Sequence, residues 1–513
     1  MTAKESSQAH SAAEWLTSRT LLIFILFAIE ILAIDFLKLP DIMAFDHYAF
    51  CDAGANLTLQ YVTSHGLRPT IDFGYNYGLL PILVGRIWFG IAGITPISLQ
   101  VLMTVCDLVI AWAIAKIVSR IRFGAVGLAL IAITLGFAVQ ASYPSLAQAV
   151  EAVLLVSALA YQARGSRSSA LGFACAAVFA KPSMGYVYSL VLLVAIAGQR
   201  WRARAKLDDW IRELAPAVAT GTALILVLGI IYGPVPLVRT VLPIEGMSNY
   251  RAVNFGFFTG AGREFWNPHG RPWLFYLVDF SGFWIAATLF LICSGVAAIL
   301  HLLAREDIAN PEAMRRNEII ATCAVLHVAF IAMFFGNQWS WIYYAYFLTI
   351  GVAAAAGAGA IQRRVTIGLC VMGIMAWTHE FRLERLCWDR GQRDAVTAGL
   401  WASSDEREEW RLVLDSIRGR KAVVLDLKGA VELMYPEFEP PVTLYLDPGL
   451  IKSFEIRRKL EQLSEAQMVV VPVNIGIESC NGIPDAPEFK AAIKEFEPRM
   501  RGKFFDVYQR LKE

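Results

Sequence analysis

The sequence contains a series of apolar runs, each about long enough to cross a lipid bilayer as a helix. A hydrocarbon core of roughly 30 Å needs about 20 apolar residues per helix, and such runs recur from residue 20 to residue 378. Only 18% of the residues are charged, against about 25% in a typical soluble domain. The chain must therefore fold mainly in lipid, which excludes a wholly cytosolic enzyme. Its net charge of +2 also argues against binding of nucleic acid, which requires a basic surface.

About eleven spans are predicted, and the basic turns between them set their direction. The segments are 20–37, 97–118, 124–140, 146–162, 168–181, 184–199, 212–232, 276–302, 318–336, 341–360 and 365–378. A further run at 79–94 is short and carries Arg86, so we expect it to lie in the interface or to re-enter the membrane. Lys and Arg gather in five turns, near residues 116–122, 164–167, 200–206, 315–316 and 363–364. Such turns mark the cytoplasmic side, so the loops 38–78 and 233–275 and the C-terminus are predicted to lie outside.

The composition changes after residue 378. Residues 379–513 are rich in charged side chains, and β-rich runs at 422–427, 442–446 and 468–472 alternate with helical patterns at 451–463 and 488–496. The predicted fold class is mainly α: a polytopic transmembrane helical domain (1–378), followed by an extracytoplasmic α/β domain (379–513). No glycine-rich phosphate loop opens a helix in this second domain, so we expect it to serve in packing, acceptor docking or partner binding.

Two acids lie in the first outer loop, within a few residues of the end of the first span. Asp46 and Asp52 are expected at the depth of the lipid headgroups, where poor solvation raises the basicity of a carboxylate toward that of a general base. The alternative is that both are solvated loop acids or helix caps.

The same loop resembles the GT-C membrane glycosyltransferases. The similarity is closest to the protein O-mannosyltransferase-like group that includes the bacterial lipid A aminoarabinose transferases. The matching residues are Asp52 or Asp46, Gly66, Pro69, Asp72, Phe73, Tyr77, Gly78, Leu79 and Pro81. The resemblance covers the first third of the membrane domain well, and the remainder only in layout.

The resemblance implies an enzyme whose catalytic Asp, here Asp52 or Asp46, acts as base with a polyprenyl-phosphate sugar as donor. It also implies substrate-binding roles for Asp72 and Tyr77. One departure is that the Lys-Pro-Pro-Leu turn of the aminoarabinose transferases is replaced by Tyr77-Gly-Leu-Leu-Pro81, which lacks the lysine expected to hold the lipid phosphate. No cofactor is assigned. A divalent metal stays open, because some relatives with an Asp-x-Asp arrangement need one and others do not.

Lys181 is a candidate replacement for that lysine. It follows an apolar segment at its predicted outer end, where an ammonium can pair with a lipid phosphate or simply snorkel to the interface. Glu151 stands near the outer start of its helix. The resemblance implies that such an acid faces the site, whereas the helix dipole alone also favours it there.

The second outer loop supplies further cations and aromatic residues. Arg251, Arg263, His269 and Arg271 are candidate ligands for phosphate oxygens, since the guanidinium fork fits them. Of the eight cysteines, Cys51, Cys387 and Cys480 fall on the predicted outer side and could pair; none of the eight shows the spacing of a metal site.

The sequence therefore predicts a multi-pass glycosyltransferase of the inner (cytoplasmic) membrane. A sugar would move with inversion from polyprenyl phosphate to a lipid, glycan or protein acceptor on the outer side. A transporter or flippase, a glycan polymerase or ligase, and a non-catalytic scaffold are the alternatives. A transporter is expected to carry ionisable residues in the middle of its helices or repeated broken helices, and here the acids crowd one outer loop instead.

Overall fold

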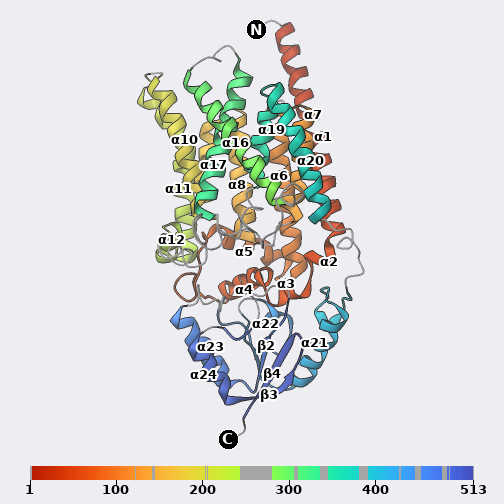
Figure 1. Cartoon of the computed structure of the whole chain (residues 1–513). Helices are drawn as coiled ribbons and strands as arrows, with labels where there is room; N and C mark the ends of the chain where they lie inside the picture. Colours follow the sequence, from red (N-terminus) through yellow and green to blue (C-terminus); the bar gives the residue numbers. More distant parts are fainter. Residues whose placement is uncertain are drawn as a thin grey trace.

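The computed structural model shows a long α-helical bundle with a small α/β region at one end (Figure 1). It describes residues 3–121, 123–140, 145–202, 204, 206–242, 280–304, 310–334, 345–380, 391–426, 429–444, 452–475, 482–484 and 486–511. The bundle helices are α1 (Ala3–Leu37), α6 (Pro96–Arg120), α7 (Gly124–Gln140), α8 (Leu146–Ala163), α9 (Arg167–Val178), α10 (Pro182–Arg202), α11 (Leu207–Tyr232), α16 (Phe280–Ala304), α17 (Pro311–Phe334), α19 (Ala345–Ala356) and α20 (Ala360–Glu380). Within the described residues, each predicted apolar segment overlaps one of these helices, which confirms the mainly α fold class.

Six of the described helices are long and apolar enough to cross a membrane. These are Ser18–Leu37, Pro96–Arg120, Leu146–Ala163, Pro182–Trp201, Leu207–Tyr232 and Gly282–Ala304. Local sequence sets their ends. Thr95 caps α6 by accepting a hydrogen bond from the Ser98 amide (3.2 Å), and Pro96 occupies the first turn, where its missing N–H costs nothing.

The basic turns lie together at the end of the bundle that holds the N-terminus, opposite the C-terminal region (Figure 1). Thr20 at the start of the first span donates to Ser119 near the end of α6 (2.8 Å). Arg167 of α9 forms an ion pair with Glu318 of α17. Arg316 donates to the carbonyl of Gly357 between α19 and α20 (2.7 Å). These contacts lie in or beside four of the five predicted basic turns, those near residues 116–122, 164–167, 315–316 and 363–364. The four turns thus lie at one end of the molecule.

The C-terminal region is built on a four-stranded sheet with the order β1-β2-β4-β3. Its strands are β1 (Ala422–Val424), β2 (Met468–Pro472), β3 (Phe496–Arg501) and β4 (Phe505–Arg510). β1 and β2 are parallel, with Ala422 opposite Met468, and the other two pairs are antiparallel. The helices of this region are α21 (Ser404–Ile417), α22 (Val431–Met434), α23 (Ser453–Glu465) and α24 (Pro487–Ala492). The predicted α/β character is confirmed.

Two details of this region differ from the prediction. The described part of the run predicted as β at 442–446 lies in no strand: Pro440 and Pro441 precede it and lack the N–H that a ladder needs. The helical pattern at 488–496 covers only α24 and a 3-10 turn, Ile493–Glu495, after which Phe496 begins β3. α20 continues to Glu380, slightly past the predicted domain boundary at residue 378, and that boundary stays a prediction.

The first outer loop packs directly against the C-terminal region. Trp410 of α21 is fully buried, and its ring contacts those of Phe45, Phe50 and Phe505 at centroid distances of 5.4, 5.6 and 4.8 Å. Buried aromatic side chains contribute several kcal/mol each through the area they remove from water. One apolar core therefore spans both parts.

Candidate active site

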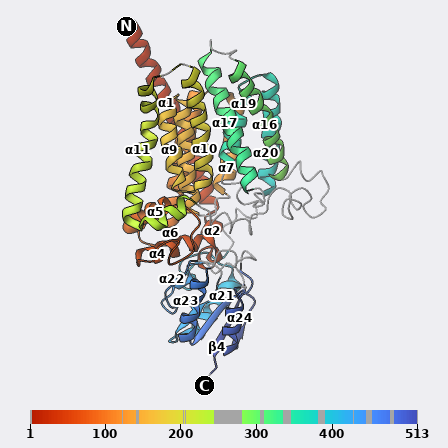
Figure 2. The same cartoon turned by 90° about the vertical axis from the view of Figure 1, so that its left-hand side faces the viewer.

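The loop that is predicted to lie outside after the first span folds into three short helices between the bundle and the C-terminal region (Figures 1 and 2). They are α2 (Leu39–Ile42), α3 (Phe45–Ala49) and α4 (Asp52–Ser64). Asp46 lies in the first turn of α3, and Asp52 is the first residue of α4. An acid in the first turn is favoured by the helix dipole. The two candidate bases thus start successive helices at the same end of the bundle.

Asp52 begins the face of α4 that reaches helix α8. Its side chain is exposed. One turn later, Asn56 donates to the Asp52 carbonyl (2.8 Å) and accepts a hydrogen bond from the Leu146 amide (3.1 Å) at the start of α8. Glu151 follows between one and two turns further along α8 and is 1% exposed. Residues i and i+4 share a helix face, so Asp52 lies on the α8 side of its helix.

Asp46 instead faces the C-terminal region. Its Oδ1 accepts from the His47 amide (2.9 Å), and it lies close to Glu406 of α21. Burial, reinforced by the charge of Asp46, raises the pKa of Glu406 to about 8. The Phe45 amide donates to the Trp401 carbonyl (2.8 Å), and the Trp401 amide donates to Met43 (3.0 Å). The two acids therefore have different surroundings: Asp52 lies on the side of α4 that faces α8, whereas Asp46 lies close to Glu406 of α21.

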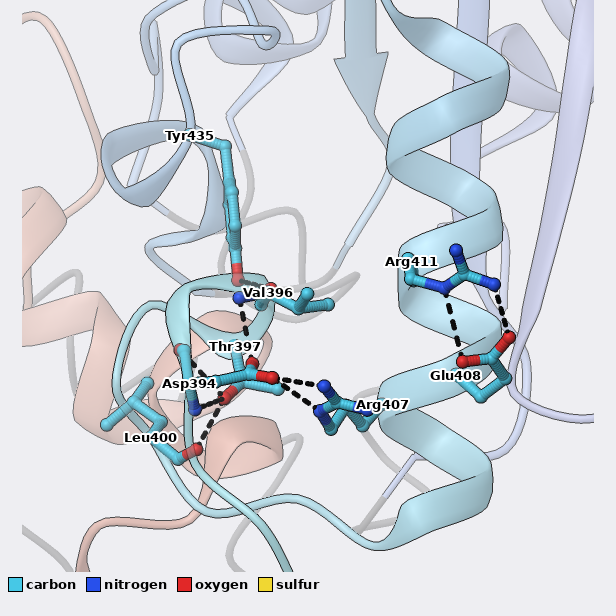
Figure 3. A network of polar contacts seen from close by, with 8 residues as sticks. All are labelled: Asp394, Val396, Thr397, Leu400, Arg407, Glu408, Arg411 and Tyr435. Atoms are coloured by element: carbon cyan, nitrogen blue, oxygen red, sulfur yellow. Dashed lines mark hydrogen bonds and ion pairs between the residues drawn. The ribbon is translucent and has the colours of Figure 1, made fainter.

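A polar network joins residues 394–400, just before Trp401, to the first turn of α21 (Figure 3). Asp394 accepts from the Val396 amide (2.9 Å) and forms an ion pair with Arg407. Thr397 donates to the Leu400 carbonyl (2.6 Å). Because Arg407 follows Glu406 directly, the ion pair ties the helical turn that carries Glu406 to residues 394–400.

Two motifs far apart in the sequence meet at Lys181. The Gly78 amide donates to the Ala180 carbonyl, and the Leu80 amide donates to the Phe179 carbonyl, both at 2.9 Å. This pairing places the Lys181 ammonium 5.9 Å from the centre of the Tyr77 ring, within cation–π range. Glu151 is near enough to attract the ammonium electrostatically. Lys181 itself is 7% exposed, so it is buried beside an aromatic ring and an acid rather than extended into the interface.

Asp72 is bound by two arginines. Its carboxylate accepts from Arg68 Nε (3.0 Å) and lies 3.6 Å from Arg458 Nη2 of α23. Although partial burial opposes it, the hydrogen bonds from Arg68 and the charges of both arginines lower the pKa of Asp72. These contacts tie the loop to the C-terminal region, and the predicted substrate-binding role of Asp72 stays a prediction.

Several candidates fall outside the part of the chain that the structure describes. They are Arg251, Arg263, His269, Arg271, Cys387 and Cys480. Cys51 is disulfide-bonded, while Cys106, Cys175, Cys293, Cys323 and Cys370 are free. Among the described residues, no group of three or more His, Cys, Asp or Glu is placed to hold a metal ion.

Sequence reasoning did not identify three residues of the C-terminal region that lie against this loop. They are Glu406 of α21, and Glu455 and Arg458 of α23. The pattern Ser403-x-x-Glu406 is a helix-start signal, and the Ser403 hydroxyl does accept from the Glu406 amide (3.2 Å). That signal locates the start of α21. It carries no information about the proximity of Glu406 to Asp46, which arises from tertiary packing.

No protein-family model matches the chain, and no curated protein matches it significantly. Among solved structures, the fold is similar to that of ArnT from Cupriavidus metallidurans, crystallised with undecaprenyl phosphate bound. The two share 12% identity over 95% of this chain and 98% of that one, with a TM-score of 0.50. At this identity the likeness concerns the fold alone: the chain has an ArnT-like membrane fold.

Proposed function

We propose that this protein is a membrane glycosyltransferase that takes its sugar from a polyprenyl-phosphate donor. The observation that carries the proposal is the arrangement of Lys181, Tyr77 and Glu151. Glu151 lies on α8, whose first residue donates a hydrogen bond to Asn56 on the Asp52 side of α4. A buried ammonium held by a ring and an acid is suited to bind a lipid phosphate. The structure of ArnT, similar in fold, contains undecaprenyl phosphate.

Asp52 is the base in this proposal. The carboxylate takes the proton of an acceptor hydroxyl or amine, whose oxygen or nitrogen attacks the anomeric carbon as the bond to the phosphate oxygen breaks. Lys181 stabilises the charge that develops on the departing phosphate. Because a phosphate leaves without protonation, one carboxylate suffices and the anomeric configuration inverts. Asp52 is preferred to Asp46 because its helix face reaches α8, whereas Asp46 lies beside Glu406.

The reaction is proposed to take place outside the inner membrane. The basic turns gather at the end opposite the C-terminal region, and short basic turns mark the cytoplasmic side. Cys51 of the first outer loop is disulfide-bonded, and disulfides persist in oxidising compartments. A reporter fused after residue 513 should therefore read as extracytoplasmic; a cytoplasmic readout would overturn this orientation.

Membranes carrying single variants test the chemistry with radiolabelled polyprenyl-phosphate sugars. We expect Asp52→Asn to lower sugar transfer about 100-fold or more, the usual contribution of a general base, and Asp46→Asn to lower it much less. Asp41→Asn, in the same loop, is the matched control. If Asp52→Asn and Asp46→Asn both transfer sugar like the parent at equal abundance, the proposed base is wrong. Binding of the lipid without transfer to any acceptor would favour the flippase alternative.

A further inference from the structure

Helix α23 of the C-terminal region contacts the outer loop just before Tyr77. Arg458 Nη1 donates to the Asp72 carbonyl (2.8 Å), and its Nη2 lies 3.6 Å from the Asp72 carboxylate. One turn earlier, the Glu455 carboxylate lies close enough to the backbone amide of Gly74 for the amide to stabilise its charge. Residues three apart share a helix face, so α23 binds two neighbouring points of the loop with one surface.

Glu455 is built into this contact. It is 1% exposed and also accepts from the Thr443 hydroxyl (2.6 Å) and the Lys452 amide (3.0 Å). A buried carboxylate is costly unless polar partners satisfy it, and here one partner, the Gly74 amide, belongs to the loop that carries Tyr77. Removing the charge of Glu455 therefore weakens its attraction to the Gly74 amide, along with its bonds to Thr443 and Lys452.

The loop transmits this hold to Lys181 over a few residues. The buried Tyr75 ring contacts Phe73 (6.4 Å) on one side and Tyr77 (5.8 Å) on the other. Its hydroxyl donates to the Gly78 carbonyl (3.2 Å). The Gly78 amide in turn binds the segment that carries Lys181. Each link is a direct contact. These contacts lead from the segment that carries Lys181, through residues 72–78, to Glu455 and Arg458 of α23.

We propose that Glu455 and Arg458 are positioning residues of the site: by holding the loop at Asp72 and Gly74, they place Tyr77 over Lys181 and so set the affinity for a lipid phosphate. The proposal rests on the proposed function, and it gives the C-terminal region a defined role. That region is then a part of the donor site, acting through residues 72–78, rather than a separate appendage.

Full-length protein in detergent tests the proposal with two measurements, and undecaprenyl phosphate is the probe. Hydrogen exchange reports the protection of the Gly78 amide, which neither α23 residue touches. Titration reports the dissociation constant of the lipid. The variants are Glu455→Gln and Arg458→Gln. The controls are Glu461→Gln and Arg457→Gln, which make the same chemical changes at exposed positions of the same helix.

We expect both positioning variants to exchange the Gly78 amide at least tenfold faster and to raise the dissociation constant for undecaprenyl phosphate about fivefold or more, with Arg458→Lys intermediate. Unchanged exchange would overturn the hold on the loop. Faster exchange with unchanged lipid affinity would overturn the link to Lys181. Because loss of folding would also weaken binding, each variant is compared at equal protection of the β2 amides, which lie inside the sheet.

The two proposals fail in different ways. If the parent protein does not bind undecaprenyl phosphate, the proposed function fails, and the functional part of this inference fails with it. If the parent binds the lipid and the α23 variants bind it equally well, the proposed function stands and the positioning role is refuted.

Discussion

Replacing Gly78 by alanine should displace the loop that carries Tyr77. A Cβ at this position would lie well under 3.0 Å from the carbonyl oxygen of Phe179 and 2.9 Å from the amide nitrogen of Ala180. Both are backbone atoms, so no flexible side chain can move aside. The loop must shift by roughly 1 Å or more, since overpacking of this kind is relieved only by backbone movement.

The cost can be worked from the contacts that the shift breaks. Two backbone hydrogen bonds, from the amides of Gly78 and Leu80, contribute about 1 kcal/mol each, and overpacking adds about 1–3 kcal/mol. The Tyr77 ring, now 5.9 Å from the Lys181 ammonium, moves beyond the roughly 6 Å limit of a cation–π contact. A charge-assisted contact to phosphate is worth about 1.5–3 kcal/mol, so misplacing Lys181 should weaken lipid binding by about tenfold or more.

The assay is titration of undecaprenyl phosphate into the purified variant and parent. Gly90→Ala is the matched control, because Gly90 lies in the next helix, α5 (Leu80–Ala92), and a Cβ there meets nothing within 4 Å. We expect the control to bind like the parent. Equal lipid affinity for Gly78→Ala and Gly90→Ala would refute the reasoning that the paired backbone segments set the place of Lys181.

Three further predictions concern the interface of the C-terminal region. Trp410→Ala should lower the free energy of unfolding by about 3–5 kcal/mol and make the region protease-sensitive, whereas alanine at Trp201, which is 83% exposed, should not. The pKa of Glu406, raised from 4.5 to about 8 by burial and by Asp46, means that its stabilising contribution is complete below about pH 4.5 and is lost as the pH rises through about 8. Thermal unfolding at pH 6 and pH 9 should show this loss in the parent and not in Glu406→Gln. Reductant or Cys51→Ser should cost about 2–5 kcal/mol, and Cys293→Ser, at a free cysteine, should cost nothing measurable.

The membrane fold could be predicted because lipid imposes a length rule that is local in sequence. Each predicted segment became a helix, since a backbone in hydrocarbon must satisfy its own hydrogen bonds. The small sheet was predicted less well. β1 and β2 are continuous apolar runs, but β3 (Phe496–Arg501) carries only one fully buried position. An exposed edge strand of this kind lacks the alternation that identifies a strand.

The candidate site was predictable residue by residue but not as an arrangement. The sequence points to Lys181 and to the turn at Tyr77 individually, yet their pairing is made by backbone hydrogen bonds between segments about 100 residues apart and has no side-chain pattern. Asp46 is likewise a candidate from the sequence, whereas Glu406 is not, and tertiary packing alone brings the two together. Contacts made through the main chain depend on the fold as a whole, so a single sequence gives the components of such a site without their distances.

The position of Gly54 shows how closely the C-terminal region is fitted to the outer loop. A Cβ on Gly54 would lie 2.6 Å from the Ala430 amide nitrogen, and that amide donates to the carbonyls of Tyr48 (3.1 Å) and Ala49 (3.0 Å). The Thr58 hydroxyl, one turn along α4, donates to the Gly429 carbonyl (2.5 Å). The helix that begins with Asp52 therefore packs backbone to backbone against the turn at residues 429–430. Since protein interiors transmit displacement rather than absorb it, movement of that turn must also move Asp52, so both candidate catalytic elements, α4 and the Tyr77 loop, depend on the C-terminal region for their place.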